Sequence, residues 1–418
     1  MGPTQLELAM RWKGEIDGDL APFLAGYRPV PGVHDELVDA TGRPRPHWTK
    51  LLGRLAAFGR AEIERRFAGA DRHLADSGVV YRVYGEDADR PWPLAHLPIV
   101  VDANDWAVLA EGVAQRARLF EAILGDLMGE GRLVADGVLP AALVVGNPEF
   151  LRPLAGIRPV GGAHLHLYAA DVTRAPDGRW WVLADRTQAP SGTGYAIENR
   201  VAVSRALPDL FDGLGVERLG PFFQAMRSGL AATVGRDDPR IALLTPGPWN
   251  ETYFEHAYLA RVLGFQLVEG GDLVASGGNV AVRTVEGPGR VDVLVRRIDS
   301  DWADPLELEP SSRLGVPGLV EAVRRGGVAV ANALGSGLVE APALTGYLPG
   351  LARRLLGEDL RLPNVATWWC GEPAARRTVL ADLDRLLLSP AFGPSLRGIL
   401  DSTGVLGSRL SAAGKARI

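Results

Sequence analysis

The chain has 418 residues, of which 47% are hydrophobic and 23% are charged, and its formal net charge is −5 at pH 7. This composition is typical of a globular protein of two or three domains, and it excludes a disordered chain, a coiled coil and a fibrous repeat. Proteins that bind nucleic acid through its phosphates are usually basic, so we expect no nucleic-acid partner. The single cysteine, Cys370, allows no intrachain disulfide, which fits a soluble cytoplasmic protein.

Charged residues interrupt the first 24 residues, so we expect no signal peptide. The longest weakly polar stretch, residues 326–339, is too short to span a bilayer, and we expect no membrane partner. Lysine occurs only as Lys13, Lys50 and Lys415, while arginine is abundant. Residues 51–414 contain no lysine, so a phosphate or carboxylate that a basic side chain binds in this range must be bound by arginine.

Hydrophobic spacing predicts the elements of the first half of the chain. Helices are expected at residues 45–75 and 105–127, and strands at 79–84, 97–101 and 140–146. A hairpin is then expected, because the alternating strands 164–168 and 180–184 flank the turn Pro176-Asp177-Gly178. The loop 189–194 leads from the hairpin into a helix that carries Glu198.

The second half of the chain alternates between strand and helix patterns from about residue 205. Expected strands are 241–244, 265–268, 280–284, 291–296 and 328–331, and expected helices are 254–263 and 318–325. This alternation predicts a mostly parallel sheet over 241–331 with helices on both faces, and the hairpin would belong to a different, antiparallel sheet. Ligands of such sheets bind beyond the carboxyl ends of the strands, where the loops 245–251 and 332–337 lie.

Several polar groups are candidates for chemistry, and each has a simpler structural explanation. Carboxylates and an amide suited to Mg²⁺, with arginines suited to phosphate, surround the hairpin, but surface ion pairs are the commoner role of such residues. Residues 250–256 fit either an anion site or helix capping. His164 and His166 share a strand face, yet no further ligand completes a metal set. The glycines of 332–337 suit either a ligand or a plain turn, and residues 296–301 fit a cleft wall or a solvated charge run.

Many separated segments, in order, resemble the circularly permuted type 2 ATP-grasp family, in the branch often fused to a C-terminal alpha-E domain. The resemblance covers roughly residues 25–395 and rests on segments 168–174, 181–192, 198–200, 244–256, 269–273, 296–299, 314–319, 332–337, 356–358 and 367–371. It implies an α/β (α+β) fold made of a permuted ATP-grasp lobe with the hairpin (1–204), a pre-ATP-grasp parallel α/β domain (205–345) and the start of a second lobe (346–418). That last part is expected to be truncated.

ATP-grasp enzymes are carboxylate–amine ligases, in which ATP phosphorylates an acid and an amine attacks the acylphosphate. The resemblance therefore implies ATP and Mg²⁺ as cofactors, a small-molecule or peptide acid and amine as substrates, and an alpha-E domain as a candidate partner. It assigns Mg²⁺ to Asp171, Asp185, Glu198 and Asn199. It assigns nucleotide binding to Ser191, Gly192, Asn332, Gly335, Ser336 and Gly337, and catalytic phosphate contacts to Arg174, Arg186 and Arg297.

The chain departs from the family pattern at functional positions. Related members carry Glu-Asp-Asn where this chain has Ala184, Asp185 and Arg186, and they carry a lysine where Ser389 stands. A degenerate, non-catalytic module within a complex is therefore the alternative to a ligase. Because Arg186 supplies a fixed positive charge, we expect ATP binding to depend less on Mg²⁺ than in those members. We also expect Asp171, Asp185, Glu198 and Arg297 to converge on one cleft.

Overall fold

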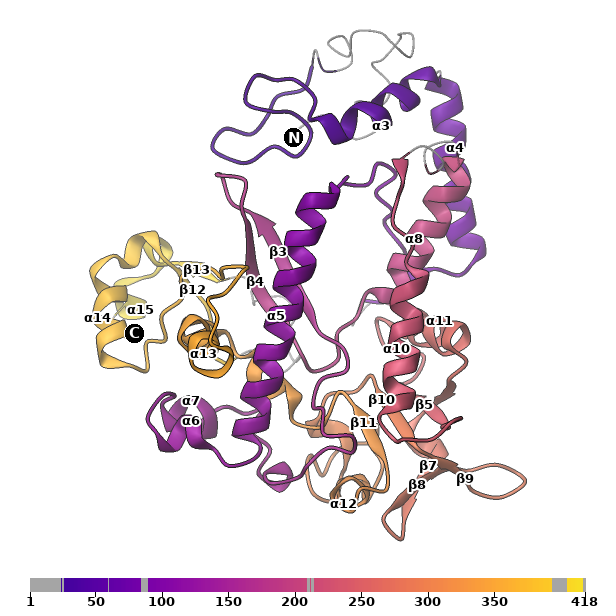
Figure 1. Cartoon of the computed structure of the whole chain (residues 1–418), viewed down its shortest axis with the longest axis vertical. Coiled ribbons are helices and arrows are strands. Elements are labelled where there is room, and N and C mark those ends of the chain that lie inside the picture. The colour runs from indigo at the N-terminus through magenta and orange to yellow at the C-terminus, as the bar shows by residue number, and fades with distance from the viewer. Residues whose placement is uncertain are drawn as a thin grey trace.

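The computed structural model describes residues 24, 26–58, 60–83, 89–208, 211, 214–392 and 404–415. Figure 1 shows the arrangement of the chain. Its helices are α3 (Pro46–Ala57), α4 (Arg60–Asp76), α5 (Ala103–Leu127), α6 (Arg132–Ala135), α7 (Ala141–Val145), α8 (Thr193–Ala206), α10 (Gly220–Ala232), α11 (Tyr253–Leu263), α12 (Leu319–Arg324), α13 (Leu348–Leu356), α14 (Pro373–Ala381) and α15 (Ala412–Lys415). Short 3-10 helices are η1 (Arg152–Leu154), η2 (Gly270–Asp272), η3 (Asp301–Ala303), η4 (Ser336–Glu340), η5 (Pro342–Tyr347), η6 (Leu383–Arg385) and η7 (Gly407–Arg409).

The strands form one parallel sheet and several small antiparallel sheets. They are β1 (Val80–Tyr81), β2 (Arg90–Pro91), β3 (Ala169–Arg174), β4 (Trp180–Arg186), β5 (Ile241–Leu244), β6 (Gln266–Val268), β7 (Leu273–Ser276), β8 (Asn279–Val282), β9 (Gly289–Val291), β10 (Val293–Arg296), β11 (Ala329–Ala331), β12 (Leu387–Leu388) and β13 (Val405–Leu406).

The parallel sheet confirms the main prediction for residues 241–331. Its strand order is β11-β10-β5-β6, and all three pairings are parallel. Alternate side chains face opposite layers: Leu243 packs with α10 and α11, whereas Ala242 and Leu244 pack in the core that contains α12. The sheet is therefore buried on both faces, which is why its strands are continuously apolar. The predicted strand 280–284 is β8, which belongs instead to the separate antiparallel sheet β7-β8-β9.

The hairpin β3-β4 forms its own antiparallel sheet, as predicted, with its turn at residues 176–178. However, its first strand begins at Ala169 and not at His164. The backbone N–H groups of His164 and Leu165 donate to the Glu121 carboxylate. The two following N–H groups donate to the side chain of Asn332. Because side chains already satisfy these donors, this segment does not pair as a strand.

Four predictions for the first half are wrong, wholly or in part. Residues 45–75 form two helices, because Phe58 adopts an extended backbone at the end of α3. Residues 97–101 form no strand, and residues 140–146 form the helix α7, which starts after Pro140. A short apolar run fits a buried helix as well as a strand, which explains the latter error. The strand expected at 79–84 shortens to β1, and Tyr84 lies outside the described residues.

Helix α5 connects the parts of the molecule. Asp102 caps its first turn by accepting from the N–H groups of Asn104 and Asp105. Its C-terminal half packs in one core with the parallel sheet, α12 and α13. This core draws residues from all three predicted domains, whose boundaries at 204/205 and 345/346 stay a prediction. A second core joins α3 and α4 to α8. No helix within the described ranges is both long and apolar enough to cross a membrane.

Two glycines of α5 give a matched test of its packing. A methyl group at Gly112 would overlap the side chain of Leu362, whereas one at Gly125 would meet open space. We therefore expect Gly112→Ala to lower the free energy of unfolding by about 1–3 kcal/mol through overpacking. Gly125→Ala should raise it by about 0.5–1 kcal/mol, because alanine favours helix. Urea unfolding of both variants checks this, and equal effects of the same sign would contradict the packing described.

Candidate functional site

Buried polar residues follow three strands of the parallel sheet. Thr245 follows β5, Arg296 ends β10 and Asn332 follows β11, and each of these residues is buried. Because the three strands are parallel, these residues lie at one edge, where ligands of open α/β sheets bind. We call the residues gathered here the carboxyl-edge network.

The loop 187–194 follows the hairpin and makes hydrogen bonds to residues of the carboxyl-edge network. The Thr187 hydroxyl donates to the carbonyl of Ser336 at 2.7 Å, and Arg297 Nη1 donates to the carbonyl of Pro190 at 2.7 Å. The N–H groups of Gly192 and Gly194 both donate to Glu255 Oε1 at 2.8 Å. One loop therefore links the hairpin to the ends of β10 and β11 and to α11.

Glu255 provides an internal anion at one end of the network. Its carboxylate is fully buried at the N-terminus of α8 and lies 3.4 Å from Arg297 Nη2. Helix N-termini attract anions, so Glu255 occupies a place where a phosphate could otherwise bind. Next to it, His256 lies between the hydroxyls of Thr245 and Thr252. Burial, aided by the charge of Arg297, lowers the pKa of His256 to about 2, so this imidazole is neutral.

Arg296 provides a buried cation at the other end. Its guanidinium donates to the carbonyls of Asn332, Ile298 and Ala333, and to the Ser336 hydroxyl at 2.9 Å. The Asn332 side chain is itself bonded to backbone on both sides. Of the predicted nucleotide contacts, Asn332, Gly335, Ser336 and Gly337 are therefore buried and structural here, whereas Ser191 and Gly192 are exposed.

Three carboxylates lie near Arg296, those of Glu149, Asp299 and Glu340, and the carboxylate of Asp301 lies near Glu149. Glu340 accepts from the N–H groups of Thr187 and Gln188, which ties it to the loop. Burial raises the pKa of Glu149 to about 7, and the other three carboxylates add to this rise. Burial also raises the pKa values of Asp299 and Glu340. Several negative charges thus compete for one buried cation.

The hairpin separates two of the predicted Mg²⁺ ligands. Asp185 is buried, where Arg116 holds it through two hydrogen bonds of 2.8 and 2.6 Å and the Tyr168 hydroxyl donates to it. The register pairs Asp185 with Ala170 and Asp171 with Ala184, so Asp171 and Asp185 point to opposite faces. Asp171 instead pairs with Arg186 on the exposed face at 2.7 Å.

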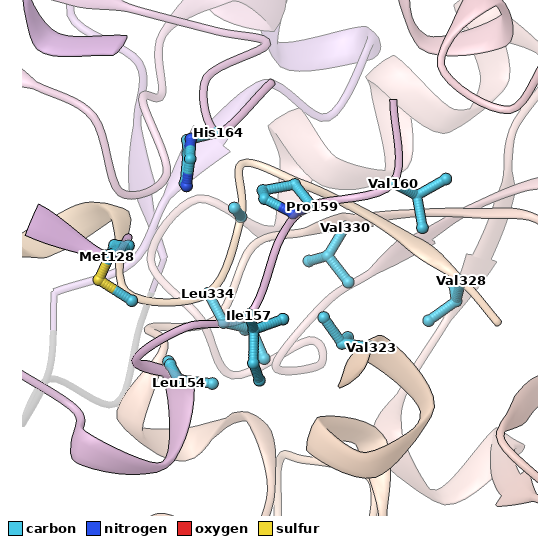
Figure 2. Close-up of a pocket in the computed structure, with 11 residues that line it drawn as sticks. Met128, Leu154, Ile157, Pro159, Val160, His164, Val323, Val328, Val330 and Leu334 are labelled. Carbon is cyan, nitrogen blue, oxygen red and sulfur yellow. The ribbon is translucent and has the colours of Figure 1, made fainter. Parts of the chain in front are cut away.

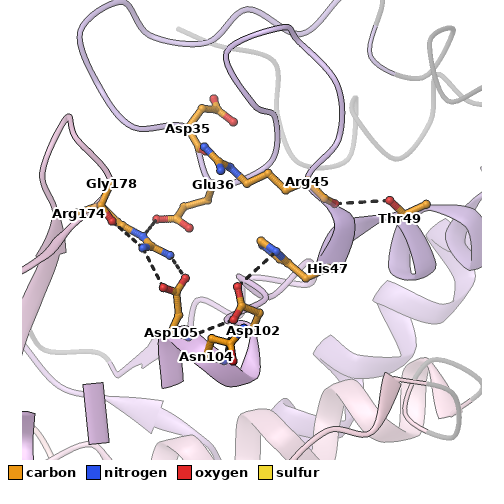
Figure 3. Close-up of polar contacts among 10 residues, drawn as sticks. All are labelled: Asp35, Glu36, Arg45, His47, Thr49, Asp102, Asn104, Asp105, Arg174 and Gly178. Carbon is orange, nitrogen blue, oxygen red and sulfur yellow. Dashed lines mark hydrogen bonds and ion pairs between the residues drawn. The ribbon is translucent and has the colours of Figure 1, made fainter. Parts of the chain in front are cut away.

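The other predicted residues lie on the side of the N-terminal helices. Glu198 is buried 2.8 Å from His73 Nε2, and the Asn199 side chain accepts from Trp92 Nε1 at 2.7 Å. Figure 3 shows Arg174 between Glu36 and Asp105 near the hairpin turn. The structure therefore does not bring Asp171, Asp185, Glu198 and Arg297 to one cleft. Each has its own partners within the chain.

The predicted metal set does not fit Mg²⁺ in this arrangement. Within the part of the chain that the structure describes, no group of three or more His, Cys, Asp or Glu residues is placed to hold a metal ion. A small cavity of about 20 Å³ near β11 offers no alternative, since its lining is apolar apart from His164 (Figure 2). It has room for about one water molecule.

Four residues that organise the edge and the hairpin were not predicted as site residues: Arg116, Glu149, Glu340 and Arg296, the last known only as part of the candidate cleft wall 296–301. For Arg116 the helical spacing was a signal. It lies 3, 4 and 7 residues before Leu119, Phe120 and Ile123, and therefore on the same face of the helix as these buried side chains. A charge on the buried stripe of a helix requires a buried partner. For the other three, partners distant in sequence decide the role, and no local pattern shows them.

The two hairpin aspartates test the structural role of Asp185. We expect Asp185→Asn to lower the free energy of unfolding by about 3 kcal/mol, because it leaves Arg116 buried without a counter-charge. Asp171→Asn should change it by less than about 0.5 kcal/mol, because both partners of that pair are exposed. Denaturant unfolding measures both. If Asp185→Asn left the free energy of unfolding unchanged, the structural role of the Arg116–Asp185 pair would be contradicted.

Glu149 gives a test by pH. Its folded-state pKa of about 7 exceeds the usual value of 4.5, so the native state binds more protons than the unfolded chain between these values. Folding stability should therefore fall as pH rises from 5 to 8, by on the order of 3 kcal/mol from this group. Glu149→Gln should flatten this fall, whereas Glu130→Gln at the surface should leave it unchanged. Unfolding at a series of pH values measures the slope, and equal slopes for both variants would contradict the assignment.

Comparison with known proteins identifies relatives of similar sequence. An uncharacterized protein of Mycobacterium tuberculosis (strain H37Rv) is 41% identical over 406 residues, which cover 91% of this chain and 46% of the relative. An uncharacterized protein of Synechocystis sp. is 35% identical over 372 residues, covering 88% of this chain and 77% of the relative. The chain thus spans about half the length of the mycobacterial relative.

A solved structure gives a weaker likeness. A glutathione synthetase-like effector from Globodera pallida, determined in its apo form, matches with a TM-score of 0.48 and 13% sequence identity, over 74% of this chain and 71% of that one. A family model matches residues 98–418 and describes them as circularly permuted ATP-grasp type 2. Since that match covers most of the sequence, the chain belongs to the circularly permuted type 2 ATP-grasp family.

Proposed function

We propose that this chain takes part in an ATP-dependent carboxylate–amine ligation that proceeds through an acylphosphate. The γ-phosphoryl group of ATP would pass to the acid, releasing ADP, and the amine would then displace phosphate to form the amide. Family membership supports the use of ATP. Small-molecule or peptide substrates, and an alpha-E domain as partner, remain part of this proposal. The mycobacterial relative is about twice as long as the matched part, which leaves room for a further domain.

The exposure of Arg186 carries the proposal. Each of the three predicted phosphate-contacting arginines is paired with a carboxylate in this structure. The side chains of Arg297 and Arg174 are only 4% and 12% exposed, whereas Arg186 is 54% exposed and its partner Asp171 is 50% exposed. A buried pair is costly to break, but an exposed pair contributes only about 0–1 kcal/mol.

Arg186 can therefore exchange its carboxylate partner for a phosphoryl oxygen at little cost in free energy. A guanidinium binds phosphate through two parallel hydrogen bonds and stays charged at every physiological pH. Arg186 directly precedes the loop 187–194, where Ser191 and Gly192 are exposed. We place the phosphate contact on this face of the hairpin, with no contribution from Asp185.

A second candidate function is a non-catalytic module that binds nucleotide or a protein partner without ligation. The dispersal of Asp171, Asp185, Glu198 and Asn199 favours it, since these residues do not form one Mg²⁺ site. Use of Mg²⁺ is a general property of ATP-grasp enzymes, and phosphoryl transfer without a bound metal would lose that source of charge stabilisation.

Calorimetric titration of ATP, with and without Mg²⁺, tests the phosphate contact. We expect Arg186→Ala to weaken ATP binding about 10-fold or more, because a charge-assisted hydrogen bond contributes about 1.5–3 kcal/mol. Arg179→Ala is the matched control, since Arg179 is an exposed hairpin arginine that also pairs with an aspartate. Equal losses in both variants, or none in either, would contradict a specific contact at Arg186.

Trapping with hydroxylamine separates the two functions. With ATP and a set of amino acids and short peptides as acids, a ligase forms ADP, and hydroxylamine converts the acylphosphate to a hydroxamate. A non-catalytic module binds ATP but forms neither product. Absence of ATP binding under all conditions would contradict nucleotide-dependent function altogether.

A further inference from the structure

A groove of about 930 Å³ runs along α5. The helix forms one wall, and the segment 163–168 together with strand β3 forms the other. Phe222 of α10 also lines the groove. Its volume lies at the upper end of the range for small-molecule sites. Figure 1 shows α5 and β3 beside each other.

The walls of the groove are apolar, and small side chains create its space. Ala110, Ala114 and Ala117 line it from α5, at helical spacing. Two large aromatic side chains at the groove remain open to solvent, since Trp106 is 56% exposed and Phe222 is 47% exposed. Exposed apolar surface that lines a hollow indicates a binding site, because covering it removes apolar area from water.

The charged and titratable groups at the groove are Arg118, Glu121, His166 and Tyr168. Glu121 already accepts from the backbone of His164 and Leu165 and from His164 Nδ1. The Tyr168 hydroxyl donates to Asp185. Burial lowers the pKa of His166, so this ring is neutral at pH 7. Glu121, Tyr168 and His166 therefore have little capacity left to bind a charged group of a ligand.

Arg118 differs from them. Its side chain is 56% exposed, and its Nη2 lies 3.7 Å from Glu358, too far for a hydrogen bond. Within the part of the chain that the structure describes, Arg118 makes this one exposed ion pair and no hydrogen bond, so its donors can turn toward the groove. A single guanidinium beside an apolar groove is complementary to an apolar molecule that carries one negative charge.

We propose that the groove binds a small molecule with an apolar body and one carboxylate. The apolar body lies against the alanine-lined wall of α5, between Trp106 and Phe222, and the carboxylate pairs with Arg118. ATP fits this groove poorly, because one arginine beside apolar walls cannot balance its several negative charges.

This site is separate from the proposed phosphate contact. Ala170, which lines the groove, pairs across the hairpin with Asp185, whereas Arg186 and Asp171 lie on the opposite face. Binding in the groove therefore does not depend on the ligase proposal and is measured without ATP.

Decanoate, used below its micelle concentration, is the probe, and its binding to the whole chain is followed by calorimetry and by tryptophan fluorescence. We expect Ala114→Phe, which fills the groove, to weaken binding at least 10-fold. Ala107→Phe is the matched control and should change it less than 2-fold, because Ala107 is an exposed alanine of the same helix that does not line the groove. Circular dichroism confirms that both variants are folded.

Charge reversal tests the role of Arg118 even if a filled groove disturbs folding. Arg118→Glu should weaken decanoate at least 10-fold and strengthen decyltrimethylammonium, whereas Arg132→Glu, at an exposed arginine of α6, should do neither. Equal affinity of the unaltered chain for both amphiphiles would overturn the proposal. Displacement of decanoate by ATP would assign the groove to nucleotide instead. A dimer in sedimentation that Ala114→Phe dissociates would assign it to a second copy of the chain.

Discussion

The buried guanidinium of Arg296 is the constraint around which the carboxyl edge is built. A charge without water requires hydrogen bonds to each of its donors and counter-charge nearby, or folding would lose several kcal/mol. Three carbonyls and the Ser336 hydroxyl supply the bonds, and the surrounding carboxylates supply the charge. Because those carbonyls come from residues 298, 332 and 333, the ends of β10 and β11 cannot move independently. The loop 187–194 joins this arrangement through Glu340 and Ser336.

Local patterns predicted those parts of the fold whose cause is local. The apolar runs of β5, β10 and β11 have their physical reasons within a few residues, and these strands were predicted closely. The segment 164–168 alternates like a strand but does not pair as one, because Glu121 and Asn332 satisfy its backbone donors from far away in sequence. Such long-range bonds leave no periodicity in the sequence, and they caused the error at this segment.

The candidate site shows the same division. The sequence marks the polar residues around the hairpin, but the face to which each points depends on strand register and on burial. Asp185 and Asp171 look equivalent in sequence, yet one is bonded to Arg116 in the interior and the other is exposed with Arg186. The run Arg296-Arg297 likewise divides: one arginine stabilises the ends of two strands, and its neighbour pairs with Glu255 below the loop. The sequence therefore predicted correctly where polar residues gather. Which of them is buried and which is exposed depends on contacts that only the folded chain makes.

The hairpin is fastened in two environments that differ in their response to ions. A two-stranded sheet is marginal by itself, so its placement depends on its bonds to the rest of the chain, which include backbone bonds of Val182 to residues 363 and 365 as well as the ion pairs at each end. Near the loop 187–194, Asp185 is bonded inside the protein, where dissolved salt has little effect. Near its turn, Arg174 pairs with Glu36 and Asp105, whose side chains are about a quarter exposed and so partly open to screening. Higher ionic strength should therefore weaken the contacts at the tip of the hairpin more than those at its base.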